Sequence, residues 1–395
     1  MHDESTLSDS PGTGGEADAN RWSGCRSEFP VAGNITYLNH AAVSPVPLRT
    51  AEAVAGLFRE FTHEGISRFP DWLERVEAAR GSAAQLLGAE AREVAFAAST
   101  SDGVSAVAES LDWKPGEAVL VPRPDFPTNI YPWMHLERRG VQVQFYERRQ
   151  GRFHVEDVER ALVPGTRLLT VSSVDFASGF HCDLEALGDF CRRKGLLFFV
   201  DAIQGLGAVP MNVRRFQIHF LAAGGHKWLL SAMGCGLLFT AHEVLDRLVP
   251  NRVGWRSVLD ETAFDRLHLD FKPDAARFEA GSSNLPGICA LGASIGLLLE
   301  AGVDRIQQRI LELNNQFHAG LEERGLRVTT PMGDGERSGI LCFETPSDAQ
   351  ALWRFLDGNR VSVSLRRGAI RLAPHFYNNE NDVARFFRVL DRAPR

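Results

Sequence analysis

The stretch Phe220-Leu-Ala-Ala-Gly-Gly-His-Lys-Trp228 places a lysine directly after an apolar run and two glycines. An earlier run, Leu196-Leu-Phe-Phe-Val-Asp201, is apolar until it ends in a carboxylate. Short runs of this kind are typical of strands buried on both faces of a parallel sheet. In such sheets, ligands bind at the carboxyl ends of the strands. The two runs therefore predict a parallel sheet with Asp201 and Lys227 at its ligand-binding edge.

Similar apolar runs recur on both sides of this pair. The predicted strands are Glu93–Ala97, Ala118–Pro122, Val141–Phe145, Arg167–Ser172, Leu196–Val200, His219–Ala223 and Gly236–Thr240. Helical patterns lie between them; for example, the apolar residues between Val104 and Leu111 recur on one helical face. Strands that alternate with helices predict an α/β fold with a mainly parallel seven-stranded sheet.

After residue 285 the pattern changes to that of a smaller α+β domain. Helices are predicted over 286–299, 303–324, 347–356 and 379–390, and short strands over 326–330, 339–344, 361–365 and 369–373. Asn379, with Asp382 three residues on, resembles the N-terminal cap of the last helix. We therefore expect a tail at 1–27, a segment at 28–49 that packs with the small domain, a large α/β domain at 50–285 and a small domain at 286–395.

Composition sets outer limits on function and location. The chain has 395 residues, a net charge of -7 and no long basic run, which argues against a nucleic-acid-binding protein. Its six cysteines are scattered without a CxxC pair, so neither a zinc site nor a disulfide framework is predicted. The tail lacks the pattern of a signal peptide, and no apolar run approaches the roughly 18 residues of a membrane span. We expect a soluble, cytoplasmic protein.

Three strand ends offer groups with a chemical use. Asp201, taken alone, is as often a helix cap or an ion-pair partner as a carboxylate that keeps a ring nitrogen protonated. A lone lysine is usually solvated, but burial near other cations lowers a lysine's pKa and favours an imine with an aldehyde. Ser99, Thr100 and Ser101 come where a strand gives way to a helix, and they indicate either ordinary capping or a phosphate cradle. Together these groups are what a phosphorylated pyridine aldehyde, pyridoxal phosphate (PLP), requires.

The order of motifs also resembles that of a known family. The matching segments are Tyr37–Ala42, Asp201–Gln204, Gly225–Lys227, Phe278–Ser282 and Ile370–Tyr377. They resemble the class V aminotransferase family of fold-type I PLP enzymes, which includes cysteine desulfurases, selenocysteine lyases, kynureninases and isopenicillin-N-epimerase-like proteins. The resemblance covers roughly residues 30 to 390 and implies a PLP site between a large and a small domain, at the interface of a homodimer.

The resemblance implies a role for each matching residue. Lys227 would form the imine with PLP and move the substrate's α-proton. The implied cofactor contacts are Asp201 at the ring nitrogen, Gln204 at the ring hydroxyl, Phe126 stacked on the ring, Thr100, Ser101 and His226 at the phosphate, and Ser282 reaching across the dimer to the neighbour's phosphate. Arg371 would clamp the substrate carboxylate, unless it forms a packing ion pair. Further pocket candidates are His40, Ala41, Asn129, Arg256, Arg366 and His375.

Departures from the family pattern bear on the reaction. Desulfurases have a histidine where Phe126 stands, and a persulfide-forming cysteine where this chain reads Ser362-Val-Ser-Leu-Arg-Arg-Gly-Ala369. Phe176 replaces the asparagine that contacts the ring hydroxyl. Gly224 replaces a phosphate-binding serine, a loss that Ser99 or Ser178 would offset. Cys182 lies on a nearby loop, where a packing role is commoner than a thiol role.

These observations favour one reaction and leave others open. A lyase that cleaves the carbon–sulfur bond of cysteine or a cysteine conjugate by β-elimination needs no protein thiol, which agrees with the missing cysteine. Epimerisation at the α-carbon, transamination and decarboxylating deamination are alternatives within the same family. A non-catalytic PLP-fold scaffold is a further alternative. A dinucleotide-dependent oxidoreductase is disfavoured because no GxGxxG opens a helix after a strand.

Overall fold

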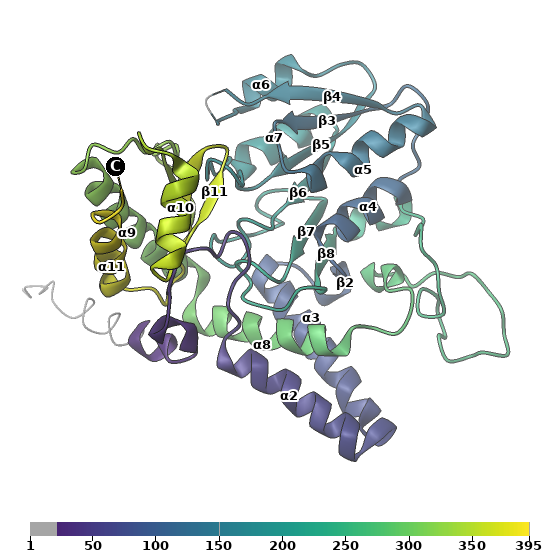
Figure 1. Ribbon diagram of the computed structural model, residues 1–395. Helices are drawn as coiled ribbons and strands as arrows, with labels where there is room; N and C mark the ends of the chain where they lie inside the picture. Colours follow the sequence, from purple (N-terminus) through teal and green to yellow (C-terminus); the bar gives the residue numbers. More distant parts are fainter. Residues whose placement is uncertain (1–21, 150, 395) are drawn as a thin grey trace, which may run out of the picture.

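A seven-stranded sheet forms the centre of the molecule (Figure 1), whose computed structural model describes residues 22–149 and 151–394. In spatial order its strands are β2 (Val94–Ala97), β8 (Gly236–Thr240), β7 (Phe220–Gly224), β6 (Leu197–Asp201), β5 (Thr166–Ser172), β3 (Ala118–Arg123) and β4 (Gln142–Glu147). The sheet is parallel except for β8, which runs antiparallel to both of its neighbours. The predicted α/β fold and its mainly parallel sheet are confirmed.

The apolar runs of the sequence form the buried middle of this sheet. Every residue of β6, β7 and β8 is buried, including Phe198, Phe199 and Phe220. Full burial of one such side chain stabilises a fold by about 1.5–3 kcal/mol. The strands therefore form a rigid platform from which Asp201 and the segment after β7 project.

Helices surround the sheet. Those between the strands are α4 (Thr100–Ser110), α5 (Tyr131–Met134), α6 (Val155–Arg160) and α7 (Leu184–Lys194). Three longer ones, α2 (Leu48–His63), α3 (Phe69–Leu87) and α8 (Leu285–Ala301), lie together, with α8 packed on the other two (Figure 1). Short 3-10 turns are η1 (Pro30–Gly33), η2 (Gly65–Arg68), η3 (Ala91–Glu93), η4 (Pro127–Asn129), η5 (His135–Arg139), η6 (His242–Arg247) and η7 (Ala275–Phe278).

The C-terminal part has its own small sheet and its own cluster of buried apolar side chains. Its elements are α9 (Val303–Glu322), β9 (Leu341–Phe343), α10 (Ala349–Gly358), β10 (Val361–Ser362), β11 (Ser364–Arg366), β12 (Ala369–Leu372) and α11 (Glu380–Leu390). Strands β11, β12 and β9 form an antiparallel sheet. Asn379 caps α11 together with Asp382, as the sequence predicted.

The strand predicted over 326–330 does not form. Val328 makes only an isolated bridge with Phe343. The Thr330 hydroxyl accepts a hydrogen bond from the Cys342 amide at 2.8 Å, so a side chain takes the place of a backbone acceptor and interrupts the ladder.

The N-terminal segment crosses to the C-terminal part of the chain. β1 (Thr36–Tyr37) pairs in parallel with β10, and Asn39 bridges to Ala373. The expected tail of residues 1–27 is too long at its C-terminal end, because residues 22–26 are helical. Trp22 is buried against Phe376, and this contact orders the segment. Residues 1–21 lie outside the described residues.

Within residues 22–149 and 151–394, no single helix has both the length and the apolarity needed to cross a membrane. Helices α8 and α9 meet these criteria only when taken together, and they are bent by 78° relative to each other.

Candidate active site

A cavity of about 380 Å³ lies at the carboxyl ends of β6 and β7, where the sequence predicted a ligand-binding edge. Its lining comes from segments far apart in the chain. The lining residues are Ala41, Ala42, Val43, Ser99, Thr100, Ser101, Phe126, Thr128, Phe176, Asp201, Ile203, Gln204, His226, Lys227, Arg366 and Arg371. The cavity therefore collects residues from the central sheet, the N-terminal segment and the C-terminal sheet.

Asp201 and Lys227 form the electrostatic centre of the cavity. Asp201 is the last residue of β6, and its Oδ1 accepts a hydrogen bond from the Ile203 amide at 3.0 Å. Burial raises the pKa of this carboxyl group, although Lys227 opposes the shift. Burial also lowers the pKa of Lys227, and Arg371 and Arg366 lower it further. A lysine whose amine loses its proton more easily is a better nucleophile toward an aldehyde.

The cavity has an aromatic wall opposite the lysine. The Lys227 Nζ lies 5.6 Å from the centre of the Phe126 ring, which makes an edge contact with Phe176 at 5.2 Å. Gln204 is fixed at both ends of its amide: Nε2 donates to the Ala41 carbonyl and Oε1 accepts from the Trp228 indole, each at 3.0 Å. The Gln204 side chain therefore has little rotational freedom. A flat ring placed between Phe126 and Lys227 would contact the Phe126 ring.

The N-terminus of α4 closes one end of the cavity. Ser99 caps the helix by accepting from the Asp102 amide at 3.1 Å. Gly103 brings α4 directly onto β7, since a Cβ there would stand 2.8 Å from the Ala222 Cβ. The helix start is thus held next to the segment that ends in Lys227, and free amides at a helix start attract anions.

Gly224 stands where the family pattern has a phosphate-binding serine, and its surroundings favour glycine. Its amide donates to the Thr100 Oγ1 at 2.9 Å, which leaves the hydroxyl proton of Thr100 available to another acceptor. A Cβ at residue 224 would stand only 3.1 Å from the His226 Nδ1 and 3.3 Å from the Thr100 Oγ1. Glycine therefore keeps these two polar groups close together in a cradle that a larger residue would crowd.

Arg371 lies at the other end of the cavity, on β12. It is only 1% exposed, its Nε donates to the Ser364 Oγ at 3.0 Å, and its Nη1 donates to the Phe176 carbonyl at 2.6 Å. Its Nη2 is buried and has no hydrogen-bond partner among residues 22–149 and 151–394. Burial lowers the pKa of this guanidinium to about 10, and Arg366 contributes. A buried cation with a free donor is costly unless an anion completes it.

Two serines suggested by the sequence lie away from the cavity. The Ser178 Oγ donates to the Asp175 Oδ1 at 2.9 Å, and Ser178 does not line the cavity; its expected phosphate contact stays a prediction that this geometry does not favour. The reason is that this hydroxyl is engaged in the turn after β5. Ser282 borders a separate cavity that Asp102 and Arg252 also line. Its expected contact with a neighbouring subunit stays a prediction.

The two candidate histidines are packing residues. His40 is fully buried, with its ring nitrogens 2.7 Å from the Ala373 carbonyl and 2.9 Å from the Tyr377 hydroxyl. His375 is also fully buried and contacts the Trp228 carbonyl. Burial lowers the pKa of both histidines. Neither histidine lines the cavity: the polar atoms of His40 join the N-terminal segment to the C-terminal part, and those of His375 contact the Trp228 carbonyl and the Phe376 amide. Their expected contact with substrate stays a prediction.

Two other pocket candidates have structural partners. Asn129 is buried and donates to the Asp125 Oδ2 at 3.0 Å, while Arg256 donates to the Ser283 Oγ at 2.7 Å. Neither lines the cavity, in contrast to Ala41 and Arg366, which do.

Sequence reasoning missed a buried ion-pair group behind the aromatic wall. Arg148, whose side chain is 2% exposed, lies 3.5 Å from an oxygen of Asp125 and 3.4 Å from an oxygen of Asp175. Each carboxylate also accepts backbone amides of its own loop: Asp125 from Phe126, and Asp175 from residues 177 and 178. The group therefore fixes the loops that carry Phe126 and Phe176. The dipeptide Asp-Phe, which occurs at both loops, was the available signal.

In the part of the chain that the structure describes, no cysteine lines the cavity. Cys182 is buried, its Sγ lies 3.6 and 3.5 Å from the carbonyl oxygens of Ser172 and Ser173, and burial raises the pKa of its thiol to about 12. A thiol that stays protonated and contacts backbone is a packing residue.

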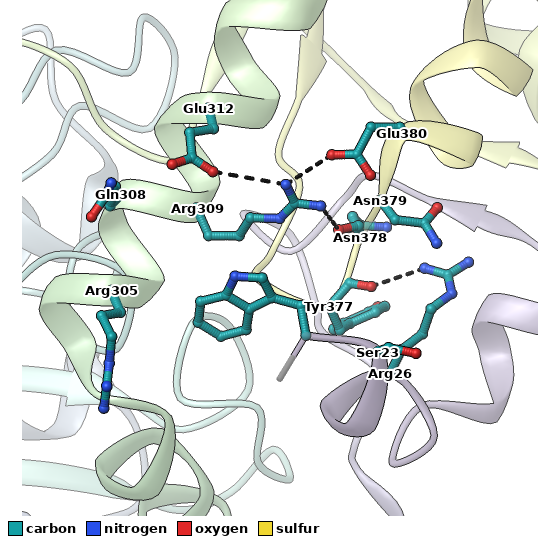
Figure 2. Close-up of a pocket in the computed structure, with 11 residues that line it drawn as sticks. Ser23, Arg26, Arg305, Gln308, Arg309, Glu312, Tyr377, Asn378, Asn379 and Glu380 are labelled. Carbon is teal, nitrogen blue, oxygen red and sulfur yellow. Dashed lines mark hydrogen bonds and ion pairs between the residues drawn. The ribbon is translucent and has the colours of Figure 1, made fainter. Parts of the chain in front are cut away.

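A second cavity, of about 480 Å³, lies between α9 and the segment before α11 (Figure 2). Arg309 there donates to Glu380 and to the Asn378 carbonyl, and Arg26 donates to the Tyr377 carbonyl and to Asp382. These arginines are satisfied largely by groups of the chain itself, so the cavity has the character of a structural joint.

The fold and the cavity together define a class of protein. The family model for class-V aminotransferases matches residues 36–386, and the chain belongs to this family of PLP-dependent enzymes. Its relatives include a probable cysteine desulfurase of Methanothermobacter thermautotrophicus, 29% identical over 91% of this chain and 94% of the relative. They also include the uncharacterized aminotransferase YcbU of Bacillus subtilis, 29% identical over 91% of this chain and 94% of that protein.

Solved structures have the same fold. The cysteine desulfurase from Thermococcus onnurineus NA1 superimposes with a TM-score of 0.85, at 26% identity over 93% of this chain and 96% of that one. The cystine C-S lyase C-DES gives a TM-score of 0.86 at 22% identity, over 93% of this chain and all of that one. The resemblance inferred from the sequence motifs is confirmed at the level of family and fold.

Proposed function

We propose that the protein is a PLP-dependent carbon–sulfur lyase that acts on cysteine or a cysteine conjugate. One observation carries the proposal: a single cavity joins the amine of Lys227 to the guanidinium of Arg371, whose Nη2 has no hydrogen-bond partner, and no thiol lines it among the described residues. An amine and an anion receptor at opposite ends suit an amino acid. The lack of a thiol in the cavity argues against a reaction that stores sulfur as a persulfide on the enzyme.

The residues of the cavity fit PLP. Asp201 would pair with the ring nitrogen, which supplies the positive charge that this buried carboxylate lacks. Phe126 would cover one face of the ring, and Gln204 would contact its hydroxyl. Thr100, Ser101 and His226 would hold the phosphate at the start of α4, where the cradle beside Gly224 is open.

Each step that the chain itself performs follows from these positions. PLP, when bound, withdraws electrons from the substrate's α-carbon. Arg371 holds the α-carboxylate through its free Nη2, and this fixes the direction of the α-hydrogen. Lys227 Nζ removes the α-proton, because burial lowers the pKa of this amine and a larger fraction of it is neutral than in water. Phe126 and Phe176 cover the reacting atoms and restrict the access of water.

The atoms of the proposed reaction balance without an oxidant. The carbon–sulfur bond breaks with its electron pair on sulfur, which leaves as a thiol after taking up a proton. Water then supplies the oxygen of pyruvate, and the nitrogen leaves as ammonium. Relatives named cysteine desulfurases support a sulfur-containing amino acid as substrate.

We also propose a homodimer in the cytoplasm. The segment from 249 to 269 exposes a group of large apolar side chains: Val249, Val253, Trp255, Leu259, Phe264, Leu267 and Leu269. Exposed apolar patches of this kind mark interaction sites, and Ser282 follows the same segment in sequence.

The division into a large domain at 50–285 and a small one at 286–395, with 28–49 joined to the small one, is part of the proposal. The pairing of β1 with β10 supports it.

The direct test supplies S-substituted cysteines to the holoenzyme and measures pyruvate and thiol together. The two products are expected in equal amounts, and Lys227→Ala should yield neither. Epimerisation is the second candidate, because Phe126 and Pro127 match that branch. Solvent deuterium that enters the α-position without consumption of substrate would support it instead. Release of neither product from any conjugate contradicts the lyase proposal.

A further inference from the structure

Arg366 is a second arginine in the active-site cavity with no assigned task. It follows Leu365 on β11, next to the strand that carries Arg371, and it lines the cavity with Lys227. The hydrogen bond recorded for it runs from Nη1 to the neighbouring Leu365 carbonyl at 2.8 Å. In the described part of the chain it forms no ion pair with a carboxylate within 4.0 Å. Its guanidinium therefore has positive charge to offer a ligand.

We infer that Arg366 binds a second negative group of the substrate, so that the enzyme selects amino acids whose side chain ends in a carboxylate. This inference rests on the proposed function, which it makes more specific. Arg371 serves the α-carboxylate, and Arg366, at the same end of the cavity, serves the distal one.

The balance of charge in the cavity supports a dianionic substrate. Its cationic side chains are Lys227, Arg366 and Arg371, and Asp201 is the single carboxylate among its lining residues. Asp201 lies at the sheet end and is taken by the cofactor ring in the proposed function. At the other end, Arg366 and Arg371 lie on adjacent, paired strands; burial lowers the pKa of Arg371, and the positive charge of Arg366 lowers it further. One α-carboxylate neutralises the buried Arg371, and the partly exposed Arg366 is then available to attract a second anion.

Two buried arginines elsewhere in the chain have acidic partners, whereas a third, Arg277, donates to the backbone carbonyls of Lys272, Leu245 and Leu248. Arg80 donates to Glu279 at 2.6 Å, and Arg148 lies between two aspartates. At Arg80 and Arg148 the chain thus supplies carboxylates to a structural cation. Among the described residues, neither Arg371 nor the partly exposed Arg366 forms an ion pair with a carboxylate within 4.0 Å, although Asp175 raises the pKa of Arg371 from a greater distance, and this arrangement supports a ligand with two acidic groups.

The test compares two substrates that differ in one charge: S-carboxymethylcysteine and its neutral isostere S-carbamoylmethylcysteine. The holoenzyme is expected to favour the acid in kcat/KM by about tenfold to 100-fold, the effect of one charge-assisted hydrogen bond. Arg366→Gln should bring the ratio close to one, and Arg366→Lys should keep part of it. Arg354→Gln, which removes one charge from the exposed face of α10, should leave the ratio unchanged.

A binding experiment separates this inference from the lyase proposal. Calorimetric titration of the holoenzyme with glutarate and with its half-amide glutaramate should show tighter binding of glutarate, and Arg366→Gln should abolish the difference. If neither conjugate is cleaved but this preference is present, the inference stands and the lyase proposal fails. If both conjugates are cleaved equally, or if Arg366→Gln slows both by the same factor, Arg366 does not bind a second negative group of the substrate. Either result overturns the inference.

Discussion

Two buried arginines lie near the cavity, in different regions of the molecule, and they contrast sharply. Arg148 follows β4 of the central sheet; its nitrogens make no hydrogen bond with the described residues, but they form ion pairs with two aspartates of neighbouring loops at 3.5 and 3.4 Å. Arg371 is on the small C-terminal sheet; it donates to Ser364 and to the Phe176 carbonyl, but in the described structure it has no carboxylate within 4.0 Å. A buried cation whose anions belong to the chain stabilises a loop arrangement, whereas one without them is ready for a ligand. The first region is scaffold and the second is recognition.

The largest expected effect concerns Lys227, which lines the cavity together with Arg371. Lys227→Ala should lower kcat/KM by about 10⁴-fold or more, because it removes both the covalent anchor and the proton carrier. A steady-state assay measures the loss. The variant should also lack the visible absorption that borohydride bleaches in the wild-type enzyme. Lys227→Arg is the control, since it keeps the charge but cannot form the imine. Substantial activity in either variant would contradict the chemistry proposed for the sheet end.

The comparison predicts that Arg148 matters for stability. Arg148→Met should lower the free energy of unfolding by about 3–5 kcal/mol, because two buried aspartates lose their shared cation. Denaturant titration measures this. The loss should shrink toward pH 4, because burial raises the pKa of Asp125, and its protonated carboxyl contributes stability that is present at low pH and declines as pH rises through the raised pKa. Adding Asp125→Asn and Asp175→Asn should restore part of the stability. A loss below about 1 kcal/mol would show that the pair is not structural.

Arg371 should behave in the opposite way. Arg371→Gln should lower kcat/KM by about 100-fold, chiefly through KM, and change the free energy of unfolding by less than about 1 kcal/mol. Steady-state kinetics and denaturant titration on the same preparation give both values. A large loss of stability in this variant would abolish the contrast with Arg148 and assign Arg371 to packing.

The sequence predicted the sheet side of the cavity better than the opposite side. Apolar runs fix strands buried on both faces, so Asp201 and Lys227 could be placed at strand ends from local pattern alone. The environments of His40 and His375 depend on the meeting of segments 337 and 147 residues apart, and no local pattern predicts that meeting. The Asp125–Arg148–Asp175 group was missed for the same reason: each member is an ordinary loop residue until the loops pack together. Long-range packing sets these environments, and no local motif records it.

The smallest expected effect concerns Asp201 and its contribution to the free energy of unfolding. In the cofactor-free protein, Asp201→Asn should stabilise the fold by about 1–2 kcal/mol at pH 8, because the raised pKa of Asp201 makes its ionised form unfavourable in the folded state. A group of this kind stabilises below its unfolded pKa and loses that contribution as pH rises through the folded value. The difference between variant and wild type should therefore vanish near pH 4 and grow with pH in denaturant titrations. It should also shrink once PLP is added to the wild type, since the ring nitrogen supplies the missing positive charge. A difference that is independent of pH would mean that Asp201 is already paired within the chain. Asp201 would then need no cationic ligand, in contrast to Arg371, which needs an anionic one.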